Sequence, residues 1–198
     1  MIVYIIRHGQ TEWNVLRKFQ GRTDIPLNEK GREVAEWTKE GLKNIVFDVV
    51  YTSPLKRAKE TAQIIAGDRD ISIIEDERII EMNFGSYEGV EARLQDDNLK
   101  QFLVAPEKYA APLDGETIED VLKRTEVFWE ELISKPEMQD KTVLISTHGA
   151  ALGALMCAVK GQGVSGLWSG GLYKNCGFSV IEIENGISRI LKENSIAY

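Results

Sequence analysis

Short runs of β-branched and aliphatic residues alternate along the chain with stretches in which apolar side chains recur every three or four positions. The runs predict strands, and the stretches predict helices that each bury one face. We predict strands at residues 2–6, 47–51, 71–74, 142–146, 178–184 and 187–192. We predict helices at residues 28–42, 53–67, 117–132 and 150–159. This alternation implies a mostly parallel sheet covered by helices, and the Asn185-Gly186 turn predicts an antiparallel hairpin at its edge.

Local signals refine some of these elements. Ser53-Pro54 supplies an N-cap serine and a first-turn proline, and Gly67 suits the end of the same helix. We expect the first helix to bury Val34, Trp37, Thr38 and Leu42. We expect the 117–132 helix to bury Ile118, Val121, Leu122, Thr125, Phe128, Trp129 and Leu132. The glycine-rich stretch 161–171 lacks the spacing of a phosphate-binding loop and is interpreted as an ordinary loop.

The chain length and composition are those of one globular domain. It has 198 residues, of which 43% are hydrophobic and 28% are charged. We expect a single domain over residues 1–198, with a small, partly helical cap at about 86–113. The 31 acidic and 24 basic side chains give a net charge of −7, which argues against sequence-independent binding to nucleic acid. An anionic substrate therefore needs a local pocket of positive charge.

The first six residues are apolar but run into Arg7, which is too short a stretch for a membrane span or a signal peptide. Cys157 and Cys176 are too few to form a disulfide framework. From these features we expect a cytoplasmic protein with reduced thiols and no membrane partner. The sequence leaves its oligomeric state open between monomer and homodimer.

The chain contains only 2 histidines, and each follows a predicted strand and precedes a glycine. His8 follows Ile2–Arg7, and His148 follows Thr142–Thr147. Open parallel sheets bind ligands beyond the carboxyl ends of their strands, so neighbouring strands would bring both imidazoles to one rim. Histidine is well suited to act as a nucleophile or proton carrier near neutral pH. The pair therefore predicts a site, although either histidine alone has an ordinary structural explanation.

Other polar residues fall near the same predicted rim. Arg7 precedes His8, and Thr11 is placed to cap a following helix, whose first N–H groups favour an anion. Arg57 lies in the first turn of the helix that begins near Ser53. Its guanidinium group is suited to phosphate, although for this motif alone a solvated basic helix face is the better explanation. No single motif decides the function.

Taken together, these segments resemble the histidine phosphatase superfamily in its phosphoglycerate mutase-like branch. The resemblance covers nearly the whole chain and rests on RHGQTEWN (7–14), QGRTDIPLNEKG (20–31), YTSPLKRAKETA (51–62), IIEMNFGSYEG (79–89), DGETIEDVLKR (114–124) and STHGA (146–150). It implies a three-layer α/β/α sandwich with a mostly parallel central sheet and an antiparallel edge.

The resemblance also implies roles for individual residues. His8 corresponds to the nucleophile that becomes phosphohistidine, and Glu81 to the proton donor for the leaving group. Arg7, Arg57 and His148 correspond to the phosphate pocket. Three further positions, Asn14, Gln20 and Gly21, fall where relatives contact the phosphoryl group or the nearby substrate. No metal or other cofactor is implied.

The chemistry of phosphoryl transfer fits these residue types. Fixed cations stabilise charge on the transferring oxygens, and Arg7, Arg57 and a donating His148 would supply this without a metal. The same cations should lower the pKa of His8, and a backbone carbonyl should fix its tautomer. Glu81 would donate a proton to the leaving alkoxide and then accept one from water, with Glu88 as the alternative acid. A zinc site finds little support in 2 histidines without an i, i+4 pair.

Two other functions remain: a phosphoglycerate mutase, and a catalytically silent phospho-ligand binder. A binder has no need of a nucleophile and an acid. The mutases compared carry Glu-Arg-x-Tyr-Gly where this chain has Glu81 to Gly85. They also carry a pair of arginines in a longer insertion after that motif, whereas Arg93 is the sole arginine between Gly89 and Gly115 here. We therefore expect a phosphatase for a small phosphomonoester. The expected pocket walls are Arg17, Phe19, Arg22, Phe84, Tyr87 and the segment 90–113.

Overall fold

A computed structural model describes residues 1–91 and 96–197 of the protein. The strands are β1 (Ile2–Arg7), β2 (Val49–Thr52), β3 (Ile73–Glu75), β4 (Thr142–Thr147), β5 (Phe178–Glu184) and β6 (Ile187–Ser195). The α-helices are α1 (Glu12–Val15), α2 (Glu29–Gly41), α3 (Lys56–Ala66), α4 (Asp97–Val104), α5 (Ile118–Ser134) and α6 (Gly149–Lys160). Short 3₁₀ turns include η1 (Glu77–Ile79), η2 (Gly85–Tyr87) and η3 (Pro106–Lys108).

The strands form one six-stranded sheet in the order β3-β2-β4-β1-β5-β6. The first four of these strands are mutually parallel, and β5 and β6 form the antiparallel edge. The β5–β6 hairpin turns at Asn185 and Gly186, both with positive φ, as an Asn-Gly turn requires. The predicted mixed sheet with an antiparallel edge is therefore confirmed.

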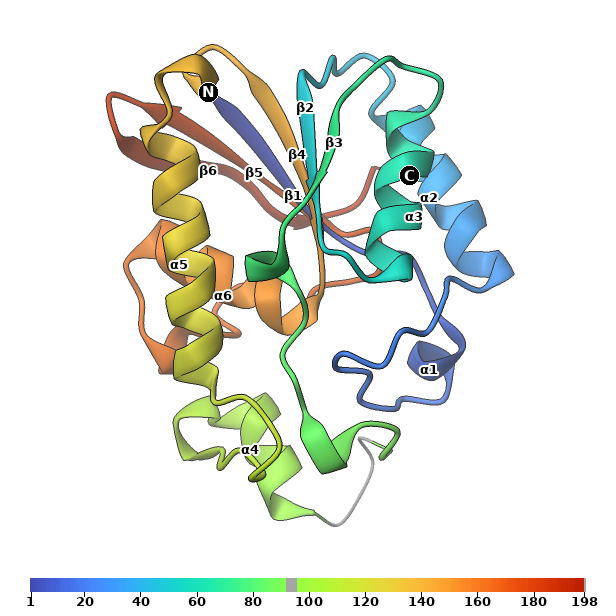
Figure 1. Ribbon diagram of the computed structural model, residues 1–198, viewed down its shortest axis with the longest axis vertical. Coiled ribbons are helices and arrows are strands. Elements are labelled where there is room, and N and C mark those ends of the chain that lie inside the picture. Colours follow the sequence, from blue (N-terminus) through green and yellow to red (C-terminus); the bar gives the residue numbers. More distant parts are fainter. Residues whose placement is uncertain (92–95, 198) are drawn as a thin grey trace.

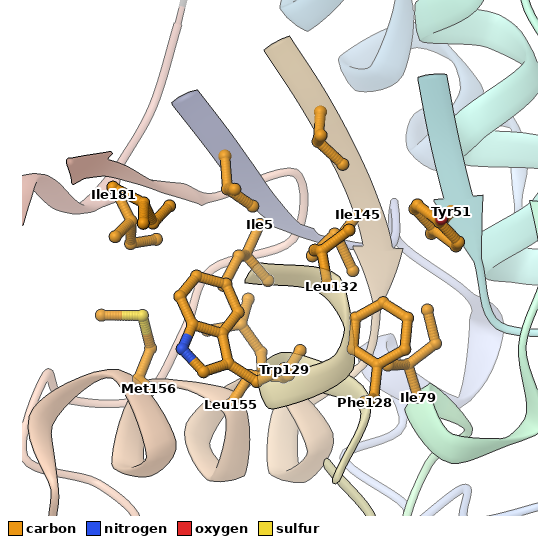
Figure 2. Close-up of a cluster of buried hydrophobic side chains, with 14 of the residues drawn as sticks. Ile5, Tyr51, Ile79, Phe128, Trp129, Leu132, Ile145, Leu155, Met156 and Ile181 are labelled. Carbon is orange, nitrogen blue, oxygen red and sulfur yellow. The ribbon is translucent and has the colours of Figure 1, made fainter. Parts of the chain in front are cut away.

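Helices cover both faces of the sheet, α5 and α6 on one side and α2 and α3 on the other (Figure 1). On the α5–α6 side, Phe128, Trp129 and Leu155 pack against strand residues such as Ile5 and Ile145 (Figure 2). The opposite core joins the apolar faces of α2 and α3 to the other side of β1, β2 and β4. This arrangement confirms the three-layer sandwich.

Most predicted elements form within a few residues of their expected bounds, and two details were wrong. Ser53 does not cap α3: the N-cap is Leu55, because the Ser53 hydroxyl accepts hydrogen bonds from Leu55 N and His148 Nε2. Trp37 is 40% exposed rather than buried, and the Lys30 ammonium lies 4.0 Å from the centre of its ring.

The expected cap segment at about 86–113 contains η2, α4 and η3, while residues 92–95, including Arg93, lie outside the described residues. Both α1 and α4 lie beyond the same end of the sheet (Figure 1). Phe102 of α4 packs against Phe19, Phe84 and Trp168. This contact ties three distant segments together over that end of the sheet. No helix in residues 1–91 or 96–197 is long and apolar enough to cross a bilayer.

Candidate active site

The two histidines meet at the carboxyl ends of adjacent strands. Strands β1 and β4 are parallel neighbours in which Arg7 lies opposite Thr147, and His8 N donates to Thr147 O at 2.9 Å. The ring centres of His8 and His148 lie 5.1 Å apart. Their side chains are almost completely removed from solvent. The predicted convergence of the two strand ends is confirmed.

The His8 ring is held in one tautomer. Its Nδ1 lies 2.7 Å from Gly9 O, and because a carbonyl can only accept, Nδ1 carries the proton and Nε2 keeps its lone pair. Burial, reinforced by the charges of Arg57 and Arg7, holds the pKa of His8 well below its usual value. His8 is therefore a neutral imidazole with a free nitrogen at neutral pH, as the sequence predicted.

The His148 ring is also fixed, by partners that the sequence did not reveal. Arg57 Nε donates to its Nδ1 at 3.1 Å, so Nε2 carries the proton and donates to Ser53 Oγ at 2.7 Å. Burial, Arg57 and His8 hold the pKa of His148 well below its usual value. The cavity lining, as far as the structure describes it, does not include His148. Here His148 supports Arg57, and both of its ring nitrogens are engaged.

Acidification should destabilise the fold as the pH falls below about 6.5. The unfolded chain has ordinary histidine pKa values near 6.5, whereas the folded protein keeps both rings neutral, so protonation favours unfolding. The contribution of the two neutral rings to the free energy of unfolding is fully present above about pH 6.5. As the pH falls below that value, each histidine lowers the free energy of unfolding by up to about 1.4 kcal/mol per pH unit. Urea denaturation between pH 7.5 and 5.5 measures it.

The His8→Ala variant serves as the control for this pH effect, and it should have roughly half the slope of the wild type. An unfolding free energy that is independent of pH over this range would contradict the neutral state of both rings.

Arg57 reaches the site from the first turn of α3 and is completely buried. Besides His148, its guanidinium group donates to Thr23 O at 2.9 Å and to Gly21 O at 2.6 Å. Burial lowers the pKa of Arg57 to about 10, so the side chain stays charged at neutral pH. Gly21 was expected near the phosphoryl group, but it is not among the described residues that line the cavity. Instead, its carbonyl accepts a hydrogen bond from Arg57.

Arg7 has a buried donor without a partner. Its Nη1 donates to Tyr173 O at 2.6 Å, but its Nε has no hydrogen-bond partner in the described part of the chain. Burial lowers the pKa of Arg7, and the nearby Glu81 carboxylate opposes this shift. A buried guanidinium N–H without an acceptor destabilises the folded protein. This donor is therefore suited to a hydrogen bond with an anion in the adjacent cavity.

Glu81 lies at the amino end of α6, opposite Arg7. Its carboxylate accepts from Ala151 N at 3.1 Å, Met82 N at 3.0 Å and Ala150 N at 3.4 Å. Backbone N–H groups at a helix N-terminus favour a carboxylate. Among the described residues lining the cavity, Glu81 is the only acidic one.

Glu88, the alternative acid, is engaged elsewhere. Its carboxylate accepts from Arg22 N at 2.8 Å and from Thr23 N at 2.9 Å, and also from the Thr23 hydroxyl. These bonds hold the loop whose carbonyls bind Arg57. The geometry therefore favours Glu81 over Glu88 as the acid.

Asn14 and Gln20 both line the cavity with their amide oxygens already engaged. Asn14 Oδ1 accepts from Thr11 N at 3.0 Å, and Gln20 Oε1 accepts from the Thr11 hydroxyl at 3.0 Å. Thr11 caps α1 as predicted. The amide nitrogens of Asn14 and Gln20 are thus the ends left to donate to a ligand.

The sequence reasoning missed the segment that precedes β5. Asn175 Nδ2 donates to His8 O at 3.0 Å and to Gly9 O at 3.2 Å, and the Tyr173 carbonyl binds Arg7. Both residues follow the stretch interpreted as an ordinary loop. The one available signal was their position just before a strand predicted in the edge hairpin. Because β5 runs antiparallel to β1, its first residue lies beside the last residues of β1, and the loop before β5 therefore lies next to His8.

The site opens into a cavity of about 430 Å³. Arg7, His8, Arg57 and Glu81 line it together with Phe19 and Phe84 from the expected walls. Arg17 lines it as well, whereas Arg22 and Tyr87 are not among its described lining residues. Within the described ranges, no cluster of three histidine, cysteine or acidic side chains is arranged to hold a metal ion.

Comparison with known proteins identifies the family. The phosphoserine phosphatase 1 of Hydrogenobacter thermophilus is 32% identical over 194 residues, 96% of this chain and 90% of that protein. A 2,3-bisphosphoglycerate-dependent phosphoglycerate mutase of Cytophaga hutchinsonii is 37% identical over 161 residues, 78% of this chain and 75% of that protein. The structure of Bacillus stearothermophilus YhfR superposes with a TM-score of 0.89 at 36% identity, covering 98% of this chain and 97% of that one.

The sequence model of the histidine phosphatase superfamily (branch 1) matches residues 3–196. That match spans both strand-end histidines, the buried arginines and the cavity that they share. With His8 and His148 side by side over a phosphoglycerate mutase-like sheet, the chain belongs to the histidine phosphatase superfamily, branch 1.

Proposed function

We propose that His8 Nε2 is the nucleophile of a phosphatase that hydrolyses small phosphomonoesters. The observation that carries this assignment is the fixed, neutral imidazole of His8 beside the unpaired Arg7 Nε in a shared cavity. The family match and the phosphatases among the relatives support a hydrolase. The cavity size is typical of sites for small molecules.

The reaction proceeds in two half-reactions. Nε2 attacks phosphorus, an N–P bond forms, the bond to the ester oxygen breaks, and protonated Glu81 gives its proton to the leaving alkoxide. Water then adds to phosphorus while Glu81 takes its proton, and the N–P bond breaks to release phosphate. The net change is ester and water to alcohol and phosphate.

One carboxyl group serves both half-reactions, as the acid in the first and as the base in the second. In the free enzyme, the Glu81 carboxyl group accepts hydrogen bonds from the first backbone N–H groups of α6, which hold it at the cavity. Arg7 and Arg57 stabilise the equatorial oxygens throughout, and no step requires a metal.

The mutase remains the second candidate because a relative carries that name. A mutase must hold the acid group of its substrate while excluding water from the phosphohistidine. The further cations lining the described cavity are Arg17, which is exposed, and Lys18, which is half-buried. Neither is a buried, fixed cation of the kind that would hold a second acidic group, so the described lining favours a phosphatase.

The test is steady-state phosphate release from a panel of phosphomonoesters that includes 2- and 3-phosphoglycerate, with a chelator present. We expect phosphate release that does not depend on added metal. Interconversion of the two phosphoglycerates without phosphate release would instead establish a mutase. Turnover that the chelator abolishes would refute the metal-free mechanism.

We also propose that the protein acts in the cytoplasm. Both cysteines, Cys157 and Cys176, are buried and free. Burial raises the pKa of Cys157 to about 11 and of Cys176 to about 12, which keeps both as unreactive thiols. Fractionation of cells that express the tagged protein would test this location.

A further inference from the structure

We propose that the leaving-group end of the cavity selects phosphomonoesters whose alcohol carries an apolar group about the size of a six-carbon chain or a single ring. Small polar substrates such as phosphoserine are disfavoured. This inference rests on the proposed phosphatase function and concerns the part of the substrate that the catalytic residues do not touch.

Part of the cavity lining is apolar, and we call its six residues the apolar wall. They are Phe19, Phe84, Phe102, Leu103, Trp168 and Leu172. These residues come from the loop after α1, the segment before η2, helix α4 and the loop before β5. Phe102 contacts Phe19, Phe84 and Trp168, so residues from these separate segments form one cluster.

Ring contacts hold this wall in place without a ligand. The Phe102 ring lies 5.1 Å from Phe84 and 5.4 Å from Trp168, in edge-on contacts. Trp168 Nε1 donates to Phe102 O at 2.7 Å, which consumes the indole donor. Trp168 is therefore half-buried and bound to α4. Because these side chains are already fixed and the indole N–H is already bonded, binding an apolar group here requires little loss of side-chain conformational entropy.

Among the described lining residues, an amino acid phosphate finds cations for its carboxylate, Arg17 and Lys18, but no free acidic partner for its ammonium group. An ammonium group needs a carboxylate, but the one acidic residue in the described lining, Glu81, lies at the phosphate end and is bound by Ala150 N and Ala151 N. An ammonium against the apolar wall would exchange its water for cation–π contact alone, because the wall holds no acidic side chain. An apolar group in the same place is expected to gain roughly fourfold in binding for each methylene that it buries.

The first test compares alkyl phosphates whose leaving alcohols have similar acidity, so that chemistry does not mask binding. We expect kcat/KM for hexyl phosphate and 2-phenylethyl phosphate to exceed that for ethyl phosphate by about tenfold to a hundredfold. Phosphoserine should fall below ethyl phosphate. Hydrolysis of all four at similar kcat/KM would overturn this inference while leaving the phosphatase intact, whereas no hydrolysis of any ester would refute the proposed function itself.

The second test places a charge on the wall. Leu172, which is 58% exposed and lines the cavity, tolerates a polar substitution without risk to the core. Leu172→Asp should lower the ratio of hexyl to ethyl phosphate kcat/KM at least fivefold and raise the relative kcat/KM for phosphoserine. The half-buried Leu103 offers the same test from α4 as Leu103→Asp.

The matched control is Val104→Asp, on the same helix as Leu103 but 77% exposed and not among the described lining residues. It adds the same charge near the cap and should leave all substrate ratios within about twofold of the wild type. An equal change in Val104→Asp and Leu172→Asp would indicate a general charge effect and would overturn the assignment of the wall.

Discussion

Replacement of His8 by alanine is expected to lower kcat/KM for every phosphomonoester by on the order of 10⁴–10⁶-fold, the range found when an enzyme loses its nucleophile. The reason is specific to this ring. Its Nδ1 is engaged with Gly9 O, which leaves Nε2 as the one free nitrogen, and the other histidine has both ring nitrogens bound. No neighbouring imidazole is therefore free to take over the attack.

The fold should survive this change. Within the described residues, the His8 side chain makes one hydrogen bond, to the carbonyl of the next residue, and the bonds that hold Arg7 and Arg57 do not involve it. We expect an unchanged circular dichroism spectrum and a loss of unfolding free energy below about 2 kcal/mol at pH 7.5. A phosphorylated protein trapped by alkaline quench from the wild type, but not from the variant, would identify the intermediate. Activity near that of the wild type would refute the mechanism.

Glu81→Gln has the second largest expected effect, and it should depend on the leaving group. Glutamine keeps an oxygen that can accept from Ala151 N, so the local structure is retained, but it cannot donate a proton to an alkoxide. We expect kcat/KM for alkyl phosphates to fall by about 10²–10⁴-fold. Aryl phosphates, whose leaving groups need no proton, should lose less than about tenfold. The measurement is the slope of log kcat/KM against leaving-group pKa.

Glu88→Gln provides the comparison. Glu88 holds the loop that binds Arg57, so its loss should affect all substrates alike and leave that slope unchanged. A slope that steepens in Glu88→Gln but not in Glu81→Gln would exchange the roles of the two carboxyl groups.

The parts of this structure that the sequence predicted are those set by local patterns. The strand-end positions of His8 and His148, the Thr11 cap and the Asn185-Gly186 turn each depend on a few neighbouring residues. Sheet topology then follows from general rules for parallel strands, which is why the convergence of the histidines could be anticipated.

What escaped prediction depends on contacts between distant segments. Ser53 resembles a helix cap, but its hydroxyl binds His148, which is 95 residues away. Asn175 lies 167 residues from His8, whose carbonyl it binds. Trp37 follows the helical period of its buried neighbours, yet packs beneath Lys30 at the surface. In each case the partner is supplied by the fold, and no local pattern encodes it.

The position of β1 has a consequence for the order in which the protein is made. Among the strands of this sheet, β1 is synthesised before its two neighbours, so neither partner exists until residues 142–147 and 178–184 have been made. At about 5–20 residues per second, the apolar segment Ile2–Ile6 waits roughly 10–30 s for its neighbours. During that interval this apolar segment lacks both of its strand partners, and such transiently exposed hydrophobic surface makes an incomplete chain prone to aggregation.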